Sequence, residues 1–254
     1  MIVPQCRILL ALILRNIRTR FFGHGLGFII SMLWPLAHIL LLLGINALLG
    51  RTSPYGDSPV LFFATGLAPF MTFGYISRWT MVSVIHNRPL LAFPVVSLTD
   101  LLLAGAILEV LSCWCMVLVL IVVLYACGVN VVPHDIVQAA YALGASMYLG
   151  FAFGIINSVV STAYPAWFTG YSLLYIGLYL VSGVFYVPEA LPAQLRYYLS
   201  FNPSLQLVEW MRSAYYDNYS SILDKPYCLA FCTVCLFLGL LCERMFRGQL
   251  LIAK

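Results

Sequence analysis

Long apolar segments separated by short polar ones dominate the pattern along this chain. The longest stretch without any acidic or basic side chain covers residues 136–188. A helix needs about 20 apolar residues to cross the hydrocarbon layer of a bilayer, so this stretch alone has room for two spans and a turn. Across the whole sequence the pattern predicts six membrane spans, at about 25–49, 59–78, 101–127, 136–161, 166–186 and 226–243.

The polar connections between these spans differ in length and character. Pro89 and Pro94 interrupt any continuous helix after the second span, so residues 79–100 are predicted to form an excursion with one or two short helices. Residues 187–225 gather both acids and bases, and they predict two short helices at about 189–200 and 203–216.

The second of these short helices has a recognisable start and a possible ion pair. Asn202 directly before Pro203 suits a helix N-cap followed by proline at the first helical position. Glu209 and Arg212 are three residues apart, so they share a helical face and can pair.

The first 22 residues do not fit a membrane span. Their apolar core, residues 8–14, is too short to cross a bilayer, and Arg7, Arg15 and Arg18 share one helical face with Arg20 just beyond. This pattern predicts an amphipathic helix over 4–22 that lies in the membrane interface. A cleavable signal peptide would need a small-residue cleavage site, whereas here the chain continues with arginines.

Composition supports one membrane domain over residues 1–254. Charged residues make up 9% of the chain and apolar residues 63%, against about 25% charged in soluble domains. The net charge of +4 is too small and dispersed to favour nucleic acid as a partner.

The distribution of basic residues predicts the orientation in the membrane. Six spans place nine of the 13 lysines and arginines on the side that carries both termini. The positive-inside rule makes this side cytoplasmic.

No motif predicts catalysis in this chain. The sequence contains no G-x-x-x-x-G-K-[ST] phosphate loop, so any ATP-driven motion would depend on another polypeptide. Cys232 and Cys235 form a C-x-x-C pair, but they lie in an apolar run with no histidine nearby. We interpret the eight cysteines as small apolar residues rather than redox or metal ligands.

The fifth predicted span carries aromatic residues at helical spacing. They follow one face of the helix and are Tyr164, Phe168, Tyr171, Tyr175, Tyr179 and Tyr186. A tyrosine hydroxyl at membrane depth needs a partner, which leaves two alternatives. The stripe is either a packing seam between helices or protomers, or the lining of a path for a sugar substrate.

Glu109 is the acid that lies well inside a predicted span. Intramembrane carboxylates are rare and are functional candidates by default. Glu109 is expected either to contribute a polar contact within a pathway or to bond, protonated, to a neighbouring helix. A proton-coupling role is the weaker hypothesis, because the neighbouring turns carry no second acid or histidine.

Taken together, the layout resembles an ABC-2 type permease, and more narrowly the inner-membrane permeases that export capsular polysaccharide in Gram-negative bacteria. The stretches that carry the resemblance are 14–21, Leu26-Gly27, Pro35, Ala37, His38, 42–45, Asp100, Leu108-Glu109, Asn202-Pro203, Glu209 and Arg212. The chain departs from the pattern of this family at two places. Residue 166 is alanine, where some relatives carry an acid, and the 79–100 excursion is less basic than expected.

The resemblance implies a homodimer of permeases in the bacterial inner membrane, with two cytoplasmic ATPase subunits that carry ATP and Mg, while this chain binds no cofactor or metal. The ATPases would dock on the N-terminal helix and on the 79–100 excursion, through Arg15, Arg18, Arg20, His86 and Arg88. The path for a lipid-linked polysaccharide would use spans 1, 2 and 5, with the tyrosine stripe and Glu109. The 187–225 segment would form an external gate around Asn202, Pro203, Glu209 and Arg212.

Periplasmic and outer-membrane export proteins, and membrane lipid, are the further partners that the resemblance implies. Other cargoes within the same transporter class stay open, namely O-antigen, teichoic acid or drugs. A membrane enzyme acting on lipid-linked sugars would need clustered acids or histidines, yet Asp100, Glu109 and Asp135 are scattered. A proton-coupled carrier would need several buried ionisable groups.

Overall fold

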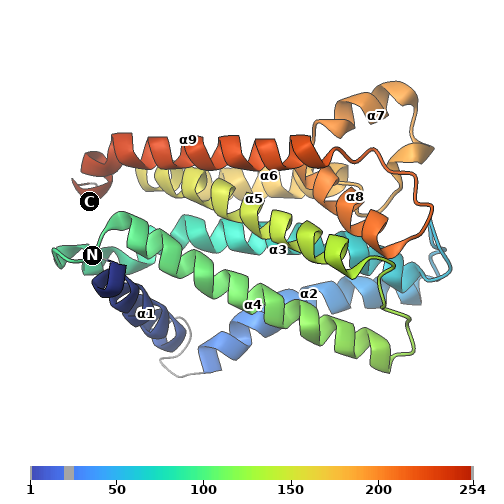
Figure 1. Ribbon diagram of the computed structural model, residues 1–254, viewed down its shortest axis with the longest axis horizontal. Helices are drawn as coiled ribbons and strands as arrows, with labels where there is room; N and C mark the ends of the chain where they lie inside the picture. The colour runs from blue at the N-terminus through green and yellow to red at the C-terminus, as the bar shows by residue number, and fades with distance from the viewer. Residues whose placement is uncertain (1, 20–25, 253–254) are drawn as a thin grey trace.

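The protein is described by a computed structural model that covers residues 2–19 and 26–252 (Figure 1). Within this part the regular structure is entirely helical. The helices are α1 (Ile2–Thr19), α2 (Leu26–Leu48), α3 (Pro59–Asn87), η1 (Arg88–Ala92), α4 (Leu98–Ala126), α5 (Ile136–Ala163), α6 (Trp167–Val181), η2 (Pro188–Ala190), α7 (Ala193–Ser200), α8 (Pro203–Tyr215) and α9 (Lys225–Ile252). The predicted all-helical membrane architecture is confirmed at this level.

Helices α2 to α6 and α9 run back and forth along the long axis of the molecule, so the two ends of the chain lie at the same end (Figure 1). Among the described residues, five of these helices are long and apolar enough to cross a membrane. The exception is α6, which is apolar but has only 15 residues.

Helices α3 and α5 form the centre of the bundle. In α3, 83% of the most apolar window is buried, whereas the corresponding shares in α2 and α9 are 28% and 22%. Helices α2 and α9 therefore leave broad apolar faces at the periphery, as expected for surfaces covered by lipid or by another protein.

Two glycines bring α5 close to α3. A Cβ added at Gly150 would lie 2.7 Å from the carbonyl oxygen of Phe73, and one at Gly154 would collide with Thr80. Small residues four positions apart allow helix backbones to approach closely where no hydrophobic effect drives association. The Gly150–Gly154 pair therefore sets the α3–α5 distance.

The end of α3 differs from the prediction. The helix continues unbroken to Asn87 and η1 follows at Arg88, so the expectation that the helix ends at residue 78 is wrong, whereas the 79–100 excursion stays a prediction. The first proline after residue 78 is Pro89, and a packing contact supports the additional turns because the Ser83 hydroxyl donates to the Leu101 carbonyl at 2.7 Å.

Helices α4 and α8 begin at well-formed caps. Ser97 and Asp100 form a reciprocal capping box at the start of α4. The two short helices predicted for residues 187–225 are present as α7 and α8, and the Asn202 side chain accepts from the Ser204 amide at 3.0 Å with Pro203 at the first helical position of α8. The predicted cap is confirmed.

Substituting Gly150 with valine should destabilise the bundle, because a branched side chain cannot fit against the α3 backbone. We expect a loss of about 1–3 kcal/mol or more, measured as a lower thermal midpoint of the detergent-solubilised protein. Gly144→Val, in the same helix, is the matched control because its Cβ would meet nothing within 4 Å. Equal midpoints for the two variants would contradict the close packing.

Candidate functional site

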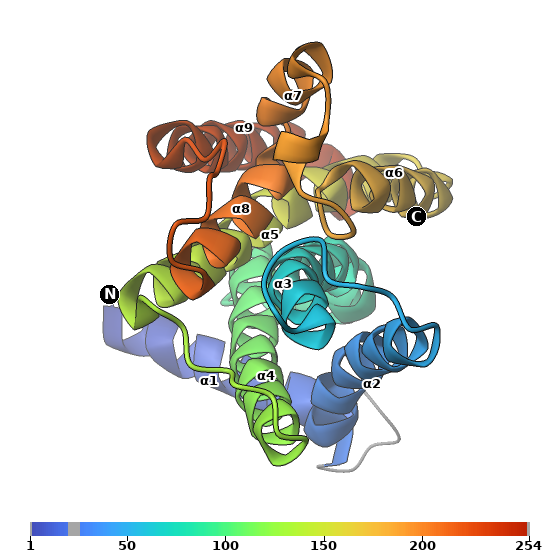
Figure 2. The same ribbon diagram turned by 90° about the vertical axis from the view of Figure 1, so that its right-hand side faces the viewer.

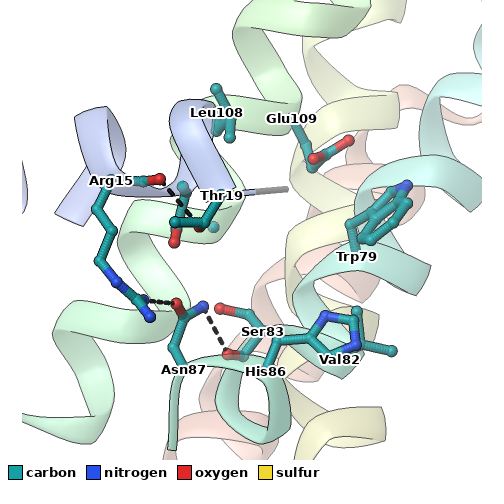
Figure 3. A pocket seen from close by; sticks show the side chains of 11 residues that line it. Arg15, Thr19, Trp79, Val82, Ser83, His86, Asn87, Leu108 and Glu109 are labelled. Carbon is teal, nitrogen blue, oxygen red and sulfur yellow. Dashed lines mark hydrogen bonds between the residues drawn. The ribbon is translucent and has the colours of Figure 1, made fainter. Parts of the chain in front are cut away.

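A cavity of about 360 Å³ lies where α1, α3 and α4 meet, and Figure 3 shows the side chains around it. Helix α1 contributes polar residues to one wall, α3 contributes the row from Trp79 to Asn87, and α4 contributes Gly105, Leu108 and Glu109. The cavity is thus built by the N-terminal helix α1 and by two long helices, α3 and α4.

Helix α1 is held in place through its apolar face. Leu12 is buried against Leu101 and Ala104 of α4, and the side-chain amide of Gln5 donates to the Asp100 carboxylate. The opposite face of the helix, with Arg7 and Arg18, is exposed. This amphipathic arrangement agrees with the pattern read from the sequence.

A chain of hydrogen bonds crosses the cavity wall from α1 through α3 to α4. Arg15 Nη1 donates to Asn87 Oδ1 at 2.6 Å, Asn87 Nδ2 donates to the Ser83 carbonyl at 2.9 Å, and the Ser83 hydroxyl donates to the Leu101 carbonyl. A displacement of α1 would therefore act directly on the end of α3 and the first turn of α4.

The predicted coupling residues are brought together only in part. Arg15 and His86 line the cavity, Arg18 is exposed on α1 and Arg88 is half-buried at the start of η1. Arg20 lies outside the described residues. Their role in docking an ATPase stays a prediction.

Glu109 does not lie with the tyrosine stripe. The residue is 3% exposed, and it lines the α1–α3–α4 cavity, to which no residue of α6 contributes. The structure thus places Glu109 in the same cavity as Arg15 and His86, and its role in a substrate pathway stays a prediction.

In the tyrosine stripe, Tyr171 is buried and takes part in a hydrogen-bond network with α3 and α5. Its hydroxyl donates to Ser77 Oγ on α3 at 2.6 Å, and Ser77 Oγ also accepts from Asn157 Nδ2 on α5 at 3.3 Å. The Trp167 indole donates to Asn157 Oδ1 at 2.9 Å. This buried network joins α6 to both central helices.

The following turns of α6 continue the same seam. Tyr175 stacks on Phe70 with ring centroids 4.9 Å apart, Tyr179 lies 5.0 Å from the same ring, and Gly74 leaves room for the Tyr175 side chain. The other members of the stripe are distributed differently: Tyr164 is exposed, Phe168 is half-buried, and the Tyr186 hydroxyl donates to the Val181 carbonyl.

Within one chain the central tyrosines thus form a packing seam between α6 and α3, which is one of the two alternatives open from the sequence. A contact with substrate is not excluded by this packing and stays a prediction.

Arg212 of α8 is a large polar side chain that is completely buried, with 0% exposure. Its Nη1 donates to the carbonyls of Gly183 at 2.7 Å and Tyr186 at 3.0 Å, and its Nη2 donates to the carbonyl of Val184 at 2.9 Å. The guanidinium carbon also lies 3.8 Å from the centroid of the Phe62 ring. One side chain of α8 therefore holds the turn after α6 and contacts α3.

The predicted pairing of Glu209 with Arg212 is confirmed, with Arg212 Nη1 and Glu209 Oε1 3.8 Å apart. The Tyr219 hydroxyl donates to the same carboxylate oxygen at 2.8 Å. Burial raises the pKa of Glu209, and Tyr219 and Arg212 oppose that rise by stabilising the carboxylate. Burial likewise lowers the pKa of Arg212, and Tyr219 and Glu209 oppose that change.

Comparison with known proteins decides the family. No family model matches the chain. The polysialic acid transport protein KpsM of Escherichia coli is 32% identical over 232 residues, which cover 91% of this chain and 90% of KpsM. This chain belongs to the family of inner-membrane proteins of capsule polysaccharide export. The family inferred from the residues is confirmed.

Two further members of this capsule export family extend the comparison. The capsule polysaccharide export inner-membrane protein CtrC of Neisseria meningitidis serogroup A is 25% identical over 237 residues, covering 93% of this chain and 89% of CtrC. The capsule polysaccharide export inner-membrane protein BexB of Haemophilus influenzae is 23% identical over 214 residues, which cover 84% of this chain and 81% of BexB.

The structure also brings together aromatic residues of α2 and α3 that the sequence did not predict to lie near one another. A smaller cavity of about 180 Å³ lies between α2 and α3 and is lined by Ile30, Ser31, Trp34, Tyr75 and Trp79. Tyr75 and Trp79 are four residues apart, so their shared helical face was a usable signal. It was missed because the second span was expected to end at residue 78.

Replacing Arg212 with alanine should be strongly destabilising, since it leaves the turn carbonyls without their donor and Glu209 without its partner. We expect a loss of about 3–5 kcal/mol, measured by thermal unfolding of the solubilised protein. Arg196→Ala, on the half-buried side of α7, is the control and should stay within about 0.5 kcal/mol of the unsubstituted protein. Similar losses for both variants would show that Arg212 has no special structural role.

Proposed function

We propose that this protein is the membrane subunit of an ATP-driven exporter that moves a capsular polysaccharide across the bacterial inner membrane. In this proposal the polysaccharide is attached to a lipid. The supporting observation is its 32% identity with KpsM over about nine-tenths of both chains. By their names, KpsM is a polysialic acid transport protein, and CtrC and BexB are capsule polysaccharide export inner-membrane proteins.

In this proposal α6 also crosses the membrane, as the fifth of six spans in chain order, although its 15 residues give a length of only about 22 Å. The turn that follows, from Ser182 to Val187, is mostly buried. Irregular backbone is tolerated at membrane depth only where protein covers it and satisfies its polar groups, and Arg212 supplies those bonds. Six spans place both termini in the cytoplasm by the positive-inside rule, and α7 and α8 in the external gate segment.

A homodimer would place the export path on the side of the molecule formed by α2, α3 and α6, which lie next to one another in Figure 2. The outer faces of α2 and α6 on this side are apolar and exposed, with Leu41 at 63% and Ile176 at 57%. The aromatic rings of Trp34, Tyr75 and Trp79 border the α2–α3 groove. Aromatic faces of this kind stack on the apolar faces of sugar rings, and their polar edges can bond to sugar hydroxyls.

Two cytoplasmic ATPase subunits would bind at the end of the molecule that carries α1 and η1. The exposed surface there combines basic side chains on α1 with the apolar residues Phe93 and Val95, which are 55% and 66% exposed. ATP and Mg would be held by those subunits and not by this chain. Periplasmic and outer-membrane export proteins would receive the polymer at the opposite end.

The proposed function predicts that this chain restores surface capsule to cells that lack their own permease, when it is produced with its ATPase. Surface capsule would be measured with a capsule-specific antibody, on intact and on permeabilised cells. With an ATPase whose Walker lysine is replaced, the polymer should accumulate inside the cells. Full capsule on cells that contain the chain and the inactive ATPase would contradict an ATP-driven exporter.

Pairing through the α2–α6 side is expected to bring equivalent α2 residues of two copies close together. In a background with the exposed Cys6 and Cys127 replaced by serine, Leu41→Cys should yield a disulfide-linked dimer in membranes under mild oxidation. Val234→Cys, equally exposed on α9 at 56%, is the control and should stay monomeric on a non-reducing gel. Cross-linking of the α9 variant alone would place the dimer interface elsewhere.

A further inference from the structure

Arg78 lies inside helix α3, at a depth where a charged side chain is unfavourable. Because α3 continues to Asn87, Arg78 is about 14 Å from that end of the helix, and it belongs to an apolar helical stretch, Pro59–Ala92, that is long enough to cross a membrane. Charged side chains within such spans almost always face the bundle interior or a water-filled path. Arg78 is nevertheless exposed in the single chain, so water or another molecule must complete its surroundings.

Arg78 belongs to an accessible face along the second half of α3. Between positions 75 and 87 the residues that are not buried lie on one side of the helix, and they are Tyr75, Arg78, Trp79, Val82, Ile85 and His86. Tyr75 also lines the α2–α3 groove, and Arg78 bonds to α6. The face therefore opens on the side of the molecule formed by α2, α3 and α6 (Figure 2), which is the side of the proposed export path.

One hydrogen bond holds the Arg78 side chain toward α6. Its Nη1 donates to Ser172 Oγ at 3.0 Å, and the Ser172 hydroxyl donates in turn to the Phe168 carbonyl at 2.8 Å. A guanidinium has five N–H donors, so this bond uses a minor part of them. Within the described part of the chain no acidic side chain forms an ion pair with Arg78. Ser172 thus fixes the position of the charge without neutralising it.

We propose that Arg78 binds an anionic group of the exported glycolipid, a phosphate or a carboxylate, while the cargo passes along the α2–α3–α6 side. The inference rests on the proposed function and adds that the path selects for negative charge. The planar guanidinium presents parallel N–H donors that match both kinds of oxyanion, and the contact is stronger in a path shielded from bulk water than at an open surface. Ser172 is then a positioning residue, since it orients the guanidinium.

The phosphate of an ordinary bilayer lipid is the competing anion, because arginines within a span extend their side chains toward the headgroups where they can. The neighbours of Arg78 and Ser172 oppose this. Tyr171, next to Ser172, donates to Ser77, next to Arg78, at 2.6 Å. The guanidinium therefore stays at the level of the tyrosine seam instead of extending toward the end of α3.

The test uses the permease–ATPase complex without nucleotide, in nanodiscs of phosphatidylcholine, and three synthetic glycolipids with the same acyl chains. The first carries an uncharged tetrasaccharide on diacylglycerol, the second links the same sugar through a phosphodiester, and the third carries a tetrasaccharide of uronic acids on diacylglycerol. Native mass spectrometry counts the retained glycolipid. We expect at least one acidic glycolipid to be retained about tenfold better than the uncharged one, because one charge-assisted contact is gained.

Arg78→Gln should remove this preference and leave retention of the uncharged glycolipid unchanged, which also shows that the variant is folded. Arg78→Lys should keep part of the preference, since it keeps the charge but loses the paired donors. Arg196→Gln, on α7 and outside the accessible face of α3, is the control and should keep all of it. Either preference supports the proposal: the phosphodiester would assign the contact to the link between lipid and polymer, and the uronic acids would assign it to the polymer itself.

Equal retention of all three glycolipids, or of none, would overturn the proposal, as would a preference that persists in Arg78→Gln. Full displacement of the acidic glycolipid by an equal amount of plain phosphatidylglycerol would assign Arg78 to bilayer lipid and would likewise overturn it. The capsule assay remains a separate test. Restored capsule without any preference would remove only the role of Arg78, whereas no capsule with an intact preference would remove the proposed function.

Discussion

A buried turn must have its backbone polar groups satisfied by protein, and Arg212 meets that constraint for the turn after α6. Helix α6 ends after 15 residues, and the carbonyls of Gly183, Val184 and Tyr186 that follow have no helical partners. Each accepts a hydrogen bond from the Arg212 guanidinium. The cost of burying this charge is offset by Glu209, by Tyr219 and by the face of the Phe62 ring. In the proposed topology, a helix as short as α6 is compatible with the membrane because these bonds are made by protein rather than by water.

The position of α8 depends on the same contact. Arg212 belongs to α8, so bonding to the turn after α6 draws α8 down against α3 and α5, where nearly all its residues are buried. Helix α6 is in turn fixed to α3 by the seam of Tyr171, Tyr175 and Tyr179. As a result α2, α3 and α6 occupy one side of the bundle (Figure 2), which is the side where the proposed path between two protomers would run. In this arrangement the tyrosine stripe fixes the position of the proposed wall, and the aromatic residues of the α2–α3 groove would border the proposed path.

Local patterns in the sequence predicted local features well. Hydropathy located the long helices, and the Asn202-Pro203 cap and the Glu209–Arg212 pair followed from spacing alone, because each joins residues within one or two helical turns. The features that were missed join distant parts of the chain. Arg15 meets Asn87 across 72 positions, and α3 continues past residue 78 because Ser83 packs on α4. Glu109 seemed isolated in its span because its cavity neighbours come from two other helices. No periodicity reports contacts of this kind, since they depend on how the helices are arranged.

The cavity therefore changes the interpretation of the N-terminal helix. An amphipathic helix that only rested on lipid could not move the spans, but α1 is connected through Arg15, Asn87 and Ser83 to α4. In the proposed exporter, an ATPase that pulls on the exposed arginines of α1 would therefore act on two long helices at once.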